Sequence, residues 1–211
     1  MRQPAPLSEP SPPAGVADRA DVEAAVAGGP ARFTGWSLAV AELRELDLHG
    51  CEFVKCRGAQ ADFSGADLTE ARFLDCDLNN SKWRGARLPA AHFAGCKLTG
   101  AQFREVGALG LSFSRSLLRD AHLRRISFRR HHLEGVDFSG ADLVGCDFRE
   151  AVLTECSLRD ANLTDARFED ADLREADLGA LKLADASRFR GAAISRRQAA
   201  ELLSGLGLKV M

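Results

Sequence analysis

The chain repeats a five-residue unit, and it does so most plainly in Ala61-Asp62-Phe63-Ser64-Gly65-Ala66-Asp67-Leu68. Each unit holds a small residue, a polar residue, Leu or Phe, and two further polar residues. From Phe33 through Leu183 every fifth residue is Leu, Phe or Trp, with Gly58 and Ala108 as the exceptions. We call this residue the centre of its unit. Thirty-one consecutive units share one register.

A period of five fits neither a helix nor a flat strand. On an α-helix five residues turn through about 140°, so the centres would spread around the whole circumference. On a strand an odd period sends successive centres to opposite faces. The pattern is satisfied if the chain turns a corner in every unit, so that all centres point to a common axis. Successive coils then stack about 4.8 Å apart, which is a solenoid.

The phenylalanines indicate how many sides each coil has. Centres twenty residues apart are often both Phe, and the runs are Phe33, Phe53, Phe73, Phe93, Phe113 and Phe128, Phe148, Phe168. In a triangular coil, stacked Phe residues would be fifteen residues apart. In a four-sided coil they are twenty residues apart, as observed. Eleven of the twelve Phe residues lie at centres. The sequence therefore predicts an all-β, quadrilateral β-helix of nearly eight coils with an aromatic interior.

The repeated small-(Asp/Asn)-Leu unit resembles the pentapeptide-repeat family over residues 31–186. The resemblance implies a right-handed quadrilateral β-helix. It also implies a similarity to antibiotic-resistance members of the family, which mimic DNA and bind DNA gyrase or topoisomerase IV in its place, and which dimerise through their C-terminal ends.

The composition bounds the environment of the protein. The chain has 211 residues and a formal net charge of −2. It has neither an apolar run of transmembrane length nor a signal-peptide core, so we expect a cytoplasmic protein without a membrane partner. All six cysteines occupy the small inward position two residues before a centre, where Cys behaves as a small hydrophobe: Cys51, Cys56, Cys76, Cys96, Cys146 and Cys156. We expect no disulfide, metal or cofactor.

The two ends of the chain differ from the repeat. Residues 1–16 are rich in proline and are expected to be disordered. Residues 17–30 are expected to form a capping helix that ends at Gly28-Gly29-Pro30. In residues 187–211, Ser195 and Gln198 form a capping-box pattern that opens a second helix. This segment is either a cap alone or a cap and a dimer contact, the latter through Ile194, Leu202, Leu203, Leu206, Leu208 and Val210.

Charge is unevenly distributed along the repeat. Residues 32–80 carry a net charge of −4, residues 81–132 carry +9 and residues 133–185 carry −9. We call six arginines of the middle segment the basic band: Arg115, Arg119, Arg124, Arg125, Arg129 and Arg130. Asp before a centre belongs to the repeat itself, so the informative acids are those that follow a centre. They form the predicted acidic face: Glu150, Glu155, Asp160, Asp165, Glu169, Asp170 and Glu175.

Three functions are compared. In the first, two chains join at their C-terminal helices into a homodimer with an acidic middle, which mimics DNA and binds gyrase. In the second, the chain is a scaffold that binds another partner through its basic or acidic segment. We expect no direct binding to nucleic acid, although the basic band leaves it open. An enzyme is not expected, because the five histidines belong to no nucleophile, base or metal pattern.

Overall fold

A computed structural model describes residues 7–179, 187–205 and 208. The chain forms two compact units, Met1–Leu111 and Ser112–Met211. Each unit is built from the same kind of coil.

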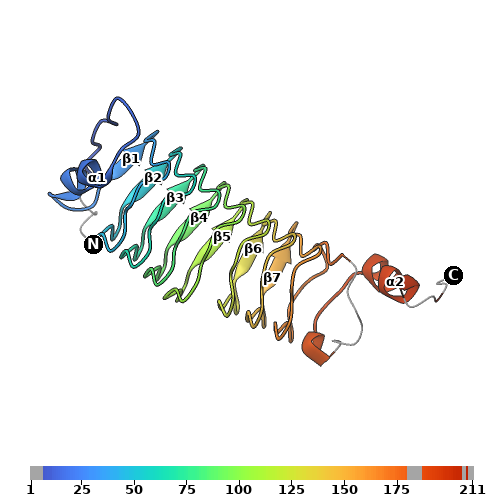
Figure 1. Ribbon diagram of the computed structural model, residues 1–211. Coiled ribbons are helices and arrows are strands. Elements are labelled where there is room, and N and C mark those ends of the chain that lie inside the picture. Colours follow the sequence, from blue (N-terminus) through green and yellow to red (C-terminus); the bar gives the residue numbers. More distant parts are fainter. Residues whose placement is uncertain (1–6, 180–186, 206–207, 209–211) are drawn as a thin grey trace. The chain divides into compact units, whose positions relative to one another are not determined.

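The first unit contains four short strands, which lie side by side in Figure 1: β1 (Arg32–Thr34), β2 (Glu52–Val54), β3 (Arg72–Leu74) and β4 (His92–Ala94). Neighbouring strands are parallel, and each residue pairs with the residue twenty positions later, as in Phe33 with Phe53. The other three sides show the same offset in isolated bridges, such as Ser37 with Arg57 and Glu42 with Asp62. Four five-residue units thus make one coil.

The second unit continues this pattern with β5 (Ser112–Ser114), β6 (His132–Glu134) and β7 (Val152–Thr154). Its strands are parallel and are offset by twenty residues, as in Leu133 with Leu153. The predicted quadrilateral β-helix is therefore confirmed. The first unit has four of these strands and the second has three, and the predicted total of nearly eight coils is approximate.

The core of each unit is a set of columns that run through its coils. In the first unit, the rings of Phe33, Phe53, Phe73 and Phe93 stack with centroids 4.6–4.8 Å apart. This distance matches the spacing of strands, so the ladder brings the rings into contact. In the adjacent column, the buried indole N–H of Trp83 donates to the Ser81 hydroxyl at 2.7 Å.

The six cysteines are free and buried, as predicted. The Cys56, Cys76 and Cys96 thiols each donate to a carbonyl of the preceding coil, at 3.2, 3.2 and 3.3 Å. Burial raises the pKa of Cys146 to about 12. The six cysteines are therefore packing groups of the interior.

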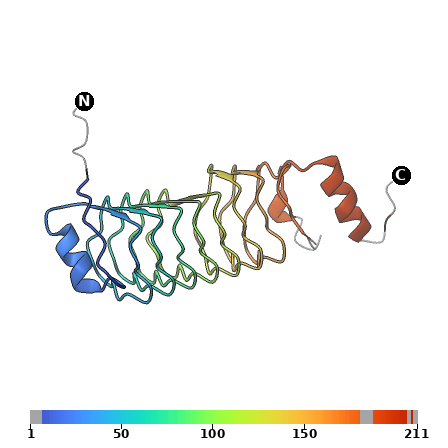
Figure 2. The same ribbon diagram turned by 90° about the horizontal axis from the view of Figure 1, so that it is seen from above.

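Three contacts close the first coil at its N-terminal edge. The amide of Arg32 donates to the Ser8 carbonyl, and the amide of Ala17 donates to the Ser37 carbonyl, both at 2.7 Å. Helix α1 (Arg19–Val26) follows, with Val22 fully buried, and it lies beside β1 in Figures 1 and 2. Its residue Arg19 donates to a carbonyl of the third side at 2.6 Å. The proline-rich segment is thus placed against the coil from residue 7 onward.

The C-terminal edge of the second unit extends further than the repeat predicts. Leu183, the last predicted centre, lies outside the described residues. The ring of Phe189 nevertheless stacks on that of Phe168 at 4.8 Å, so the column resumes with an offset of twenty-one residues.

Helix α2 (Arg196–Gly205) comes after this last coil. The predicted capping box is present, because Gln198 accepts from the Ser195 amide at 2.6 Å and donates its own amide to the Ser195 hydroxyl at 3.3 Å. The side-chain amide of Gln198 also donates to the carbonyls of Leu173 and Ala176, both at 2.7 Å. One residue therefore caps both the helix and the coil. Within the described residues, neither helix is long and apolar enough to cross a membrane.

We predict that Phe53→Ala destabilises the protein by about 3–5 kcal/mol, because it opens a cavity between two stacked rings. Urea denaturation measures this loss. Leu109→Ala is the control, since the Leu109 side chain is 85% exposed and should change the free energy of unfolding by no more than about 0.5 kcal/mol. Equal losses for the two variants would contradict the stacked column.

Candidate surface for partner binding

The corners of the coil have a distinctive backbone. A corner lies two residues after a centre, and its backbone is left-handed at most of these positions: φ is 58° at Glu150, 53° at Glu155, 57° at Asp160, 58° at Asp165 and 60° at Asp170. This conformation turns the chain by one side of the coil. Successive corners therefore occupy successive edges of the solenoid.

The predicted acidic face is not a single face. Because one coil contains four corners, the acids from Glu150 to Asp170 go once around the circumference and return to the starting edge. Glu175 begins the next side. The sequence predicts that these acids face outward, and the coil geometry distributes them over all four edges of the second unit. The acids form a ring around the second unit.

The basic band is largely neutralised by acids of the next coil. Arg119 lies 2.5 Å from Asp137, and Arg124 lies 2.5 Å from Asp142. The sequence separates each pair by eighteen residues, which amounts to one coil. Arginines of the +9 segment therefore form ion pairs with acids of the −9 segment inside the same chain.

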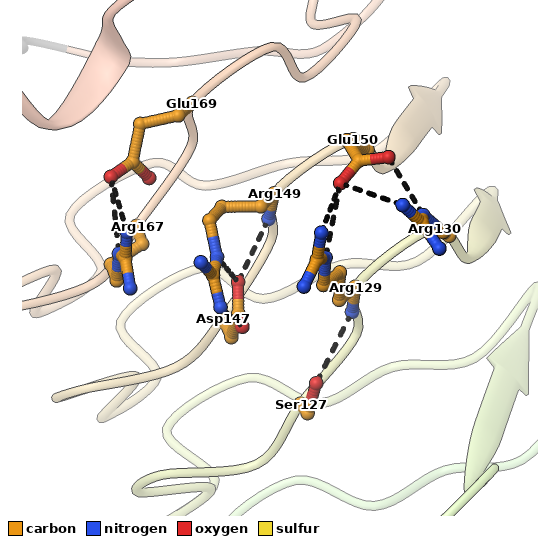
Figure 3. Close-up of polar contacts among 8 residues, drawn as sticks. All are labelled: Ser127, Arg129, Arg130, Asp147, Arg149, Glu150, Arg167 and Glu169. Atoms are coloured by element: carbon orange, nitrogen blue, oxygen red, sulfur yellow. Dashed lines mark hydrogen bonds and ion pairs between the residues drawn. The ribbon is translucent and has the colours of Figure 1, made fainter.

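Glu150 is the most heavily paired of the ring acids. Its carboxylate accepts from Arg129 at 2.5 Å and from Arg130 at 2.7 Å, as Figure 3 shows. The hydrogen bonds from Arg130 and then Arg129 lower the pKa of Glu150 to about 2. Two residues of the basic band and one of the acidic set thus bind each other.

A second row of pairs lies on the same side of the unit (Figure 3). Arg149 binds Asp147 at 2.6 Å, and Arg167 binds Glu169 at 2.8 Å. In each pair the two residues belong to the same coil and flank one centre. Glu169 is therefore also compensated, and its pKa is lowered by the hydrogen bond from Arg167.

The remaining ring acids are available to a partner. Glu155, Asp160, Asp170 and Glu175 are exposed, and none forms an ion pair with a described residue. Asp165 lies 4.0 Å from Arg188. We call Glu155, Asp160, Asp165, Asp170 and Glu175 the open acids.

Sequence reasoning missed the ion pairs between coils. Arginines and acids separated by eighteen to twenty-one residues were the available signal, since that separation corresponds to one coil. Of the basic band, Arg115 and Arg125 have no ion pair among the described residues.

The structure describes only part of the predicted dimer contact. Ile194, Leu203 and Leu208 are 37%, 38% and 54% exposed, whereas Leu202 is half-buried. Leu206 and Val210 lie outside the described residues. In the part of the chain that the structure describes, no group of three or more His, Cys, Asp or Glu could hold a metal ion.

We predict that Glu150→Gln lowers the melting temperature at neutral pH, because it removes a carboxylate shared by two arginines. The folded-state pKa of Glu150 lies below its unfolded value of about 4.3. The stability from this carboxylate is therefore present above about pH 4.3 and is lost as the pH falls through about 2. The difference between variant and unaltered chain should shrink over that range. Melting curves from neutral to acidic pH measure it, with Glu155→Gln as control. If both variants followed the same pH profile, the pairing would be refuted.

Comparison with known proteins agrees with the coil geometry. A family model described as a pentapeptide repeat region matches residues 30–103. A model described as pentapeptide repeats matches residues 112–149, 141–179 and 151–187. No curated protein sequence matches the chain significantly.

Two solved structures similar to this one are of QnrB1, a plasmid-mediated fluoroquinolone resistance protein. A trypsin-treated variant is 24% identical over 86% of this chain and 88% of that one, with a TM-score of 0.66. Full-length QnrB1 is 22% identical over 84% of this chain and 88% of that one, with a TM-score of 0.56. Likeness at these identities concerns the fold, and together with the family models it leads to one conclusion: the chain belongs to the pentapeptide-repeat family.

Proposed function

We propose that the protein is a non-enzymatic binding protein whose second unit takes the place of DNA on DNA gyrase or a related type II topoisomerase. The open acids carry this proposal. They are exposed carboxylates that no nearby arginine neutralises closely, and they surround one region of the solenoid. A basic surface that binds the DNA backbone is complementary to such a ring.

The ring arrangement favours a concave partner. Acids on four edges cannot all meet a flat surface, whereas a positively charged saddle contacts several edges at once. Four sides of five residues each set the width of the solenoid, which we expect to be comparable to that of duplex DNA. Joining of two chains through Ile194, Leu203 and Leu208 would place two acidic rings on either side of a two-fold axis.

A scaffold that uses the basic band is less well supported, because four of its six arginines already bind acids of the following coil. A scaffold that uses the open acids with another partner is the remaining alternative. It predicts binding to a basic protein that salt weakens, without any effect on a topoisomerase.

We predict that the purified protein changes DNA supercoiling by gyrase, with or without a fluoroquinolone. The variant Glu155→Gln/Asp160→Asn/Asp170→Asn should weaken this effect about tenfold, since three exposed pairs of about 0.5 kcal/mol each are lost. Its dependence on salt should also become shallower. A supercoiling assay at several salt concentrations measures both quantities.

The matched control is Glu45→Gln/Glu70→Gln/Asp75→Asn. These residues are also corner acids without an ion pair among the described residues, but they lie in the first unit. The control changes the net charge equally and should retain full activity. The proposal fails if the unaltered protein has no effect on gyrase, or if both triple variants lose activity equally.

A further inference from the structure

A polar trough runs along one side of the first unit. Its volume is about 530 Å³, and its floor includes Glu42, Asp62 and Lys82. These three residues follow one another in the ladder, because Glu42 bridges Asp62 and Asp62 bridges Lys82. Each step along the trough is therefore one coil, or about 4.8 Å.

The negative charge in the middle of the trough, on Asp62, is compensated by Arg44. The Asp62 side chain is only 7% exposed, and it accepts from the Arg44 guanidinium at 2.9 Å and from the Ser64 amide at 3.0 Å. Burial raises the pKa of Asp62, but the hydrogen bonds from Ser64 and Arg44 outweigh it and keep the pKa below its ordinary value. Asp62 is thus an ionised residue at the base of the trough, and its hydrogen bonds are made within the protein.

The two ends of the trough carry opposite charges, and only the basic end has an ion-pair partner, Asp62. Glu42 is exposed and forms no ion pair with a described residue. Lys82 lies 3.9 Å from Asp62, beyond hydrogen-bond distance, and its side chain is 51% exposed. Because Glu42 and Lys82 are two coils apart, about 10 Å separates an acidic end from a basic end.

Side-chain amides line the wall between these ends. Gln60 and Asn80 occupy corners of neighbouring coils, with φ of 61° and 56°. Both contribute to the trough, and both are exposed. In the described part of the chain, neither side chain makes a hydrogen bond, although each amide offers two donors and an acceptor.

We propose that this trough binds a short, extended peptide with free ends. The peptide's ammonium group binds Glu42, its carboxylate binds Lys82, and its peptide groups pair with the amides of Gln60 and Asn80. Extended chain spans about 3.3–3.6 Å per residue, so three residues match a separation of about 10 Å. The site discriminates by charge at both ends and is indifferent to side chains.

The test is a titration of the full chain with tri-alanine, followed by NMR of the side-chain amide signals of Gln60 and Asn80. Saturable shifts should occur at these two residues. N-acetylated and C-amidated tri-alanine should each bind about fivefold more weakly, as expected for the loss of one exposed ion pair. The capped peptides test both charges without altering the protein.

The variants locate each end. Glu42→Gln should bind free and N-acetylated tri-alanine equally, and Lys82→Gln should bind free and C-amidated tri-alanine equally. Glu70→Gln and Lys97→Gln are controls, since both residues lie outside the trough, and they should bind as the unaltered chain does. The proposal is overturned if no saturable shift occurs, if the capped peptides bind as well as the free one, or if the controls weaken binding equally. None of these outcomes bears on the open acids, which belong to the other unit.

Discussion

The constraint on which this structure depends is the pairing of each side of a coil with the segment twenty positions later. Parallel backbone hydrogen bonds fix coils at one strand spacing, so each side chain meets its counterpart in the next coil. Flat aromatic rings accommodate that distance by stacking, as Phe53 does between Phe33 and Phe73. The same register decides which charges meet outside. The same register of backbone pairing thus determines both the ring stacking in the core and the ion pairs on the surface.

The ladder also explains why the charge of the sequence differs from the charge a partner meets. A segment of +9 beside one of −9 suggests two opposed surfaces, yet Arg119 and Arg124 are bound by acids one coil later. Exposed ion pairs of this kind contribute little stability each. Their larger effect is to remove charge from the surface, so that the corner acids such as Asp160 and Asp170 dominate what remains.

The sequence was sufficient to predict the interior packing, because that packing depends only on the five-residue period of the apolar centres. The five-residue stride predicted the Phe33 column, the inward cysteines and the four sides. It could not predict that the column resumes at Phe189, since a one-residue shift destroys the periodicity that carries the signal. It also missed the pairing of Glu150 with Arg129 and Arg130. Such pairs become visible only when the twenty-residue coil is applied to the outward charges as well as to the centres, with a tolerance of a few residues for the reach of long side chains.

The left-handed corners have an implication for how such a surface changes over generations. Eighteen described corners hold a residue other than glycine, and a left-handed backbone costs such a residue roughly 1–2 kcal/mol. Glycine would relieve this strain at any of them without disturbing the packed interior. Substitutions at a corner therefore leave the packing of the core unchanged and alter mainly the side chain that is exposed to a partner. Pentapeptide-repeat chains can therefore evolve a new binding preference by substitution of corner residues alone, without a change in the coil.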